Sequence, residues 1–351
     1  MPDVFFPRVV GNEALRRRIG REFSEHSFSH AYILEGPRGF GKHLLARELA
    51  MAAACENRQS AQHTLPCGTC KFCRKIAADN CPDIITVKRE EDRATMSVDV
   101  IRAMRAGIAT VPNDLDIKVY IIEDAHRMTK QAQNALLLTL EEPPPFVLFL
   151  LLTEDARALL ETVRSRAPIL RLQPIEREAM RTYLLKDPKA VAAGAPALLC
   201  ERPEEFEAIL SLSGGAIGRA LELLAPEARR PHMTQREHAT RILQLLASNK
   251  EPDQLLLLVQ SLGTARETVT AELTTLSLAL RDLVLLTRTD RAPLLFYTDR
   301  EAAGEIAAHF TTAHLLELLL ATEAAVKALA ANANVKLTLT HLLSKLLGAN
   351  D

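Results

Sequence analysis

The stretch Gly36-Pro37-Arg38-Gly39-Phe40-Gly41-Lys42-His43 decides the fold of this chain. It follows the apolar run Ala31 to Leu34 and opens a segment in which leucines and alanines recur at helical spacing. A strand, a glycine-rich loop and a helix in this order form a phosphate-binding loop, because glycines let successive N–H groups point at phosphate oxygens. The stretch therefore predicts a nucleotide-binding α/β domain, with Lys42 reaching the β- and γ-phosphates.

One position departs from the phosphate-loop pattern. His43 stands where Ser or Thr would place a hydroxyl group on Mg²⁺. Magnesium takes oxygen ligands in a tight octahedron, so an imidazole is a poor replacement. We expect a scaffold that holds ATP or ADP but lacks a normal Mg²⁺ site, and the residues expected to contact the nucleotide are Gly36, Gly39, Gly41, Lys42 and His43.

Length and composition bound the function. The chain has 351 residues, of which 48% are hydrophobic, and a formal net charge of −1. This length predicts two or three domains, and the charge argues against a globally basic nucleic-acid-binding protein. No apolar stretch is long enough to span a membrane, and the first residues lack the pattern of a secretion signal. We expect a soluble, cytoplasmic protein.

Four cysteines are concentrated just after the phosphate-loop helix. Cys67, Cys70 and Cys73 form two overlapping C-x-x-C units, and Cys55 precedes them. Four thiolates make a closed tetrahedral zinc site, which predicts a structural Zn²⁺. Three alternatives stay open: reduced cysteines without metal, His63 as a replacement ligand, and a ferredoxin-like site through Cys81. The ferredoxin motif needs a fourth cysteine closer to the third than Cys81 is to Cys73.

An acidic pair follows a predicted buried strand. Lys118 to Ile122 is a strand-like run that ends in Glu123-Asp124, as in a Walker B motif. In that motif one carboxylate holds the magnesium shell and the next activates water, and the usual order is Asp then Glu. The reversed order predicts a degenerate catalytic site. Thr153, at the end of the apolar strand Phe146 to Leu152, is a candidate for orienting water.

Several motifs together carry a family resemblance over most of residues 5–172. They are Val10-Gly11, the phosphate loop, the cysteine cluster, Lys118 to Met128, Gln133-Asn134 continuing to Leu140-Glu-Glu-Pro-Pro, and Arg164-Ser165-Arg166. These residues resemble the AAA+ clamp-loader ATPases of bacterial DNA polymerase III. The resemblance implies a P-loop AAA+ fold, that is a parallel sheet with helices on both faces, here with a zinc knuckle inserted.

The same resemblance implies further site residues. Val10 matches a nucleotide-contacting position, and Arg219, in the segment Ser213 to Ala220, matches the sensor 2 arginine. Arg166 matches the arginine finger that stabilises charge on a phosphate bound by the neighbouring subunit. The family triplet Ser-Arg-Cys ends here in Ala167, which we interpret as a small packing residue. Ordinary surface arginines remain the alternative for Arg166 and Arg219.

The remainder of the chain reads as two helical domains. We expect an AAA+ domain over residues 1–172 with a zinc module at about 55–81, a small helical lid over 173–230, and an all-α collar for oligomerisation over 231–351. Pro226 to Pro231 is interpreted as a second linker. From about residue 233 the leucine spacing is helical throughout.

Three functions are compared. The leading one is a delta-prime-type stator of the polymerase holoenzyme, with absent or weak ATPase activity of its own. It would assemble with gamma/tau and delta subunits and help load the beta sliding clamp on primed DNA. The second is a gamma/tau-type motor that hydrolyses ATP despite His43. The third is a zinc-dependent nucleic-acid-binding P-loop protein, which the near-neutral charge and few aromatic residues disfavour.

Overall fold

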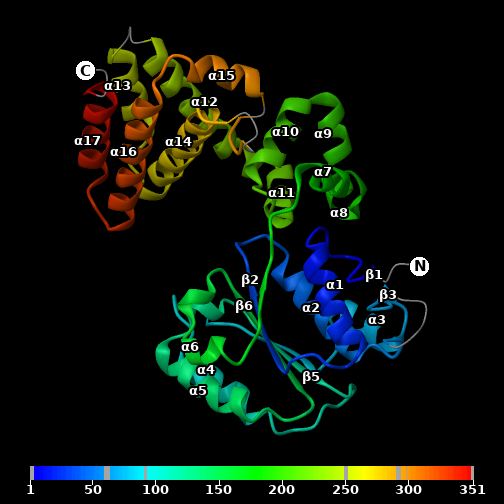
Figure 1. Cartoon of the computed structure of the whole chain (residues 1–351). Helices are drawn as coiled ribbons and strands as arrows, with labels where there is room; N and C mark the ends of the chain where they lie inside the picture. Colours follow the sequence, from blue (N-terminus) through cyan, green and yellow to red (C-terminus); the bar gives the residue numbers. More distant parts are fainter. Residues whose placement is uncertain are drawn as a thin grey trace. The chain divides into compact units, whose positions relative to one another are not determined.

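A computed structural model describes residues 4–58, 64–90, 93–248, 252–289, 294–297 and 299–348 (Figure 1). The chain divides into two compact units. The first comprises Met1–Tyr183 and Gly215–Arg219, and the second comprises Leu184–Gly214 and Ala220–Asp351.

A five-stranded sheet forms the centre of the first unit. Its strand order is β4-β5-β6-β2-β7, and every neighbouring pair is parallel. The strands are β2 (Ala31–Glu35), β4 (Ile84–Val87), β5 (Lys118–Ile122), β6 (Val147–Thr153) and β7 (Ile169–Arg171). All residues of β5 and β6 are buried, as the near-continuous apolar runs predict for strands covered on both faces.

Helices cover both faces of this sheet, which confirms the predicted α/β class. Figure 1 shows α1 (Glu13–Ser24), α2 (Lys42–Ala54) and α3 (Lys71–Ala77) on one side, and α4 (Val98–Ala106), α5 (Lys130–Glu141) and α6 (Glu161–Arg164) on the other. Successive residues of each strand point to opposite faces of the sheet. Tyr32 and Leu34 belong to one buried cluster, whereas Ala31 and Ile33 belong to the other.

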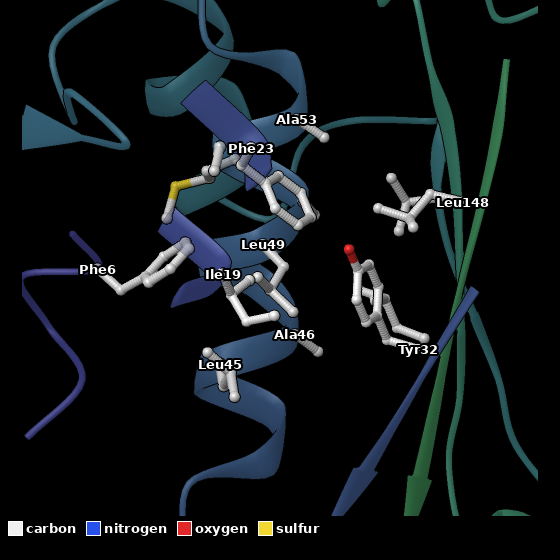
Figure 2. Close-up of a cluster of buried hydrophobic side chains, with 14 of the residues drawn as sticks. Phe6, Ile19, Phe23, Tyr32, Leu45, Ala46, Leu49, Ala53 and Leu148 are labelled. Atoms are coloured by element: carbon white, nitrogen blue, oxygen red, sulfur yellow. The ribbon is translucent and has the colours of Figure 1, made fainter. Parts of the chain in front are cut away.

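Packing against the sheet fixes the helix that follows the phosphate loop. Figure 2 shows Leu49 and Ala46 of α2 in one cluster with Tyr32 of β2 and with Ile19 and Phe23 of α1. All five side chains are at most 2% exposed. Burying an aliphatic or aromatic side chain of this size contributes about 1.5–3 kcal/mol each, so α2 is held firmly from both sides.

Short elements complete the first unit. β1 (Val4–Phe5) pairs in parallel with β3 (Thr64–Leu65) in a separate two-stranded sheet. Two 3₁₀ turns, η1 (Ala125–Arg127) and η2 (Ala156–Ala158), follow β5 and β6. α7 (Arg177–Lys186) runs from the first unit into the second.

The described elements of the second unit are all helices, as predicted. They are α8 (Pro188–Ala192), α9 (Ala195–Glu201), α10 (Pro203–Leu212), α11 (Ile217–Leu224, whose first residues belong to the first unit), α12 (Pro226–Ser248), α13 (Pro252–Ser261), α14 (Arg266–Leu286), α15 (Arg300–Ala307), α16 (Thr312–Ala330) and α17 (Val335–Gly348). The predicted linker Pro226 to Pro231 is wrong, because both prolines lie in α12. A proline fits the first helical position, where its missing N–H is not needed, and Pro231 lies within the first two turns.

Candidate nucleotide site and cysteine cluster

The phosphate loop joins the end of β2 to the start of α2. Gly39 and Gly41 have φ angles of 85° and 84°, a backbone region that favours glycine, and Gly41 caps the N-terminus of α2. A Cβ atom on Gly39 would lie 3.0 Å from the backbone nitrogen of Arg219. The sequence therefore needs glycine at position 39 for both its conformation and its close backbone neighbour.

Lys42 lies over the loop that precedes it. Its Nζ donates hydrogen bonds to the carbonyl oxygens of Gly36 and Pro37. Burial lowers the pKa of Lys42 below its ordinary value, while the nearby carboxylates of Glu154 and Asp124 act in the opposite direction. The arrangement keeps an ammonium group at the helix N-terminus, where an anion is also favoured by the backbone N–H groups.

The acidic pair at the end of β5 faces several cations. Glu123 Oε1 lies 3.6 Å from His43 Nδ1 and 3.3 Å from Lys88 Nζ. Asp124 adopts a left-handed backbone with φ of 47°, and its carboxylate lies 3.8 Å from Arg89 Nε and 3.9 Å from Arg127 Nε. A metal ion at Glu123 would have to compete with His43 and Lys88.

Thr153 lies at the end of β6, which the sheet order puts between the phosphate-loop strand and the acidic strand. Its side chain is fully buried, and its Oγ1 donates a hydrogen bond of 2.9 Å to the carbonyl oxygen of Asp155. Its own carbonyl oxygen accepts from the N–H of Gly36 at 3.1 Å. Thr153 therefore anchors the start of the phosphate loop through its backbone. That its hydroxyl group orients a water molecule stays a prediction.

Residues 215–219 belong to the first unit and touch the phosphate loop through their backbone. The N–H of Gly218 donates to the carbonyl oxygen of Gly39 at 2.9 Å, and a Cβ on Gly218 would lie 2.9 Å from Gly39 Cα. The contact brings the backbone of Arg219 to the loop. Val10 is half-buried and precedes Gly11, which has a φ of 67°. Nucleotide contacts of Val10 and Arg219 stay predictions.

Arg166 follows α6 and makes its contacts within this chain. Its Nη2 lies 2.7 Å from Glu141 Oε1, and its Nη1 donates to the carbonyl oxygen of Thr162 at 2.9 Å. About a third of the side chain, 34%, is exposed. Ala167 is buried in the core beside it, which fits a small packing residue at this position.

A buried glutamine of α5 connects the turns that follow β5 and β6 with the start of α6. The sequence-based predictions name this residue only as part of a motif. Gln133 of α5 is 3% exposed. Its Nε2 donates to the carbonyl oxygens of Met128 and Ala158, and its Oε1 accepts from the N–H of Leu160, the residue that precedes α6. The available signal is the spacing of Gln133 from Leu136 and Leu140, which in a helix puts its amide on the same face as these leucines. Buried polar groups require hydrogen-bond partners.

The structure brings the four predicted metal ligands together. One ligand atom from each of Cys55, Cys67, Cys70 and Cys73 lies within 4.8 Å of the others. Cys55 follows directly after α2, and Cys70 caps α3. Tetrahedral Zn–S bonds of about 2.3 Å put sulfur atoms about 3.8 Å apart. The Sγ atoms of Cys67 and Cys73 are 3.9 Å apart.

Backbone N–H groups point at two of these sulfur atoms. Cys67 Sγ accepts from the N–H of Cys70 at 3.3 Å, and Cys70 Sγ accepts from the N–H of Cys73 at 3.4 Å. A hydrogen bond from Cys73 lowers the pKa of Cys55 to about 5, and the same bond raises the pKa of Cys73. The donor set therefore fits a structural Zn²⁺ held by four cysteines.

Cys81, one of the two alternative ligands, stands apart from this set. Cys81 is not among the clustered cysteines; it lines a cavity of about 200 Å³ together with His43 and Arg47. Burial raises the pKa of its thiol, which disfavours the thiolate that metals bind. His63 lies outside the described residues.

Known proteins match the part of the chain that carries this site. A family described as "DNA polymerase III, delta subunit" matches residues 11–176. This segment is therefore similar to a family of DNA polymerase III subunits. Gly36, Lys42, the cysteine cluster and Arg166 all lie within the matched segment.

The curated relatives that match are gamma and tau subunits of DNA polymerase III. The chain is 32% identical over 179 residues to DNA polymerase III subunit gamma of Buchnera aphidicola subsp. Schizaphis graminum, covering 51% of this chain and 48% of that protein. It is 32% identical over 219 residues to subunit tau of Bacillus subtilis, covering 62% and 37%. The matches span less than half the length of either relative.

Solved structures also align with the chain. A gamma subunit-related protein of Thermotoga maritima is 16% identical, with 95% of this chain and 99% of that chain covered and a TM-score of 0.44. Within the described part of the chain, no helix combines the length and apolarity needed to cross a bilayer.

Proposed function

We propose that the chain is a cytoplasmic clamp-loader subunit of bacterial DNA polymerase III, of the delta-prime stator type. The proposed partners are gamma/tau and delta subunits, the beta sliding clamp and primed DNA. The observation that supports a stator best is the pairing of Glu123 with His43 and Lys88. The ammonium group of Lys88 and the imidazole of His43 occupy the carboxylate that would otherwise serve a metal ion.

Hydrolysis at the chain's own loop is disfavoured for two reasons. His43 offers nitrogen where Mg²⁺ takes oxygen, and the reversed order Glu123-Asp124 displaces both carboxylates. A displacement of about 1 Å can cost on the order of 100-fold in rate. Nucleotide bound at the loop would be held by backbone N–H groups and by Lys42. Mg²⁺ would neutralise little of the phosphate charge, because His43 makes the metal site a poor one.

Catalysis is proposed to occur at a neighbouring subunit, with Arg166 in trans. A guanidinium matches phosphate geometry with paired N–H donors, and it stays charged at any working pH. Glu141 pairs with it at 2.7 Å within this chain, which is the kind of contact that a bound phosphate could replace. Arg219 is proposed to reach the chain's own nucleotide.

The remaining parts are proposed to be structural. Zn²⁺ would hold the segment at about 55–81 together through its four cysteines. The helical segments 173–230 and 231–351 are proposed to act as lid and oligomerisation collar.

A second function, a gamma/tau-type motor that hydrolyses ATP itself, is supported by the names of the curated relatives. Lys42, the glycines and two acids are present in the required order of elements. The two functions differ in where the reaction occurs and therefore in which substitution abolishes it.

ATP turnover separates the two functions. The purified chain with ATP and Mg²⁺ should show no more turnover than the Lys42→Ala variant if it is a stator. In the reassembled complex, Arg166→Ala should lower ATP hydrolysis by about 10³-fold, the scale of arginine fingers in related reactions. Arg157→Ala is the matched control, because Arg157 is 85% exposed and pairs only locally with Asp155.

The contrary results are equally clear. Turnover by the isolated chain that Lys42→Ala abolishes would replace the stator by the motor. A complex that forms and hydrolyses ATP equally well with Arg166→Ala would remove the trans role.

A further inference from the structure

A cavity of about 800 Å³ lies between α13 and α17 in the second unit. Its floor is apolar, because Val259, Leu339 and Leu343 line it and are only 2%, 8% and 9% exposed. Leu256 lines it at the edge and is 37% exposed. The groove therefore combines a closely packed apolar floor with an exposed leucine at its edge.

The charged residues that line the groove are all positive. None of its twelve described lining residues is acidic, while Arg266 and Lys336 are among them. Arg266 is held in place, since its guanidinium donates to the carbonyl oxygens of Leu329 and Asn332. α17 as a whole contains Lys336, Lys345 and no Asp or Glu.

We propose that this groove binds an amphipathic helix of another protein, with leucine-like side chains toward Leu339 and Leu343 and acidic side chains toward Lys336 and Arg266. Two helices that flank an apolar trough are the arrangement that accepts a third helix by its apolar face. The proposal rests on the α13–α17 surface alone and does not depend on the clamp-loader function proposed above.

Charge selects this occupant over a second copy of the chain. A copy that docked the same face would bring Lys336 and Arg266 against their own kind, and juxtaposed like charges cost several kcal/mol. An acidic helix instead gains attraction that also speeds association. The chain as a whole has a net charge of −1, so the positive sign is a local property of this groove.

The direct test uses the full chain and a labelled probe peptide of about 18 residues, which makes five helical turns. The acidic probe carries leucines at intervals of three and four residues with glutamates beside them, and the control peptide has lysines in place of the glutamates. Fluorescence anisotropy should detect saturable binding of the acidic peptide and at least about tenfold weaker binding of the basic one, with the difference shrinking as salt rises.

Two matched pairs of variants locate the binding. Leu256→Ser should weaken binding about tenfold, because a leucine side chain that the bound helix covers contributes roughly 1.4 kcal/mol or more. Leu257→Ser should not, since Leu257 is 65% exposed on the same helix and does not line the groove. Lys336→Glu should weaken binding similarly, whereas Lys345→Glu, further along α17, should not.

Three outcomes would overturn the proposal: equal binding of the two peptides, no saturable binding of the acidic peptide, or equal effects within each pair of variants. Displacement of the peptide by a single-stranded oligonucleotide that binds with the same dependence on Lys336 would assign the groove to nucleic acid instead. Circular dichroism of all four variants checks that the helices are intact.

Discussion

Asp83 and Asp282 hold loops in the two units by the same arrangement. Each side chain is fully buried. The carboxylate of Asp83 accepts from three backbone N–H groups, those of residues 113–115, and Asp282 Oδ2 accepts from those of residues 295–297. A carboxylate that accepts several N–H bonds can be buried at little net cost. Neither role is visible in sequence, because each depends on a loop more than ten residues away.

Glu48 is a buried acid in a different situation. It lies on α2, fully buried, with Oε1 bonded to Arg8 and with Oε2 lacking a hydrogen-bond partner. Burial raises the pKa of Glu48 above 4.5, although Arg8 acts against the shift. The folded protein therefore binds this proton more tightly than the unfolded chain does.

The Glu48→Gln variant should show what this proton contributes. The stabilisation from the raised pKa is complete below pH 4.5 and is lost as the pH rises through the folded-state pKa. Glutamine does not ionise, so the melting temperature of Glu48→Gln relative to the native chain should increase between pH 4.5 and 7. Glu13→Gln, at a side chain on α1 that is 74% exposed, is the control for removing a glutamate charge at the surface. A parallel pH dependence of both variants would contradict the assignment.

At the scale of elements, the contact between Gly218 and Gly39 should be intolerant of any side chain. A Cβ on Gly218 would meet Gly39 Cα at 2.9 Å, and that atom is backbone. Gly218→Ala should therefore displace α11 from the phosphate loop and lower ADP affinity at least about tenfold, even though alanine favours a helix by about 1 kcal/mol.

Gly304→Ala in α15 is the matched control for this clash. Nothing lies within 4 Å of the added Cβ, so this variant should gain up to about 1 kcal/mol in unfolding free energy and leave ADP affinity unchanged. Equal ADP affinity for both variants, measured by calorimetric titration, would show that the contact at the loop is dispensable.

The cysteine cluster makes a prediction about metal content. Native protein should contain about one equivalent of zinc, and Cys70→Ser should lose it, because a hydroxyl is a poor zinc ligand beside thiolates. Cys81→Ser should retain the metal, since Cys81 lines a different cavity. Metal analysis by mass spectrometry measures both variants, and zinc loss from Cys81→Ser would add that residue to the site.

Local patterns predicted the elements of the first unit well. The apolar runs at β5 and β6, the glycine loop before α2 and the C-x-x-C units each depend on residues close in sequence. The wrong prediction of a linker at Pro226 shows the limit of local patterns. Whether a proline begins a helix or lies in a linker depends on what the following turn packs against. Contacts such as Arg166 with Glu141 join residues 25 positions apart, so no local pattern reports them.

For the whole molecule, separate cores predict separate unfolding. Two buried clusters cover the faces of the sheet in the first unit, and a third lies among the helices of the second. We expect two calorimetric transitions, because chains with several cores depart from two-state behaviour. Asp83→Ala should lower one transition and Asp282→Ala the other, each by about 3 kcal/mol for the lost charge-assisted hydrogen bonds. A single transition lowered by both variants would contradict this division.

The position of α2 has a thermodynamic consequence. This one helix of 13 residues, about 20 Å long, begins at the phosphate loop and ends against the first cysteine of the metal cluster. Metal binding that orders this helix would raise the affinity of the phosphate loop for nucleotide. Linkage then requires that bound nucleotide raise the affinity of the four cysteines for zinc by the same factor. The rate at which a chelator strips the metal would then become a readout of nucleotide occupancy.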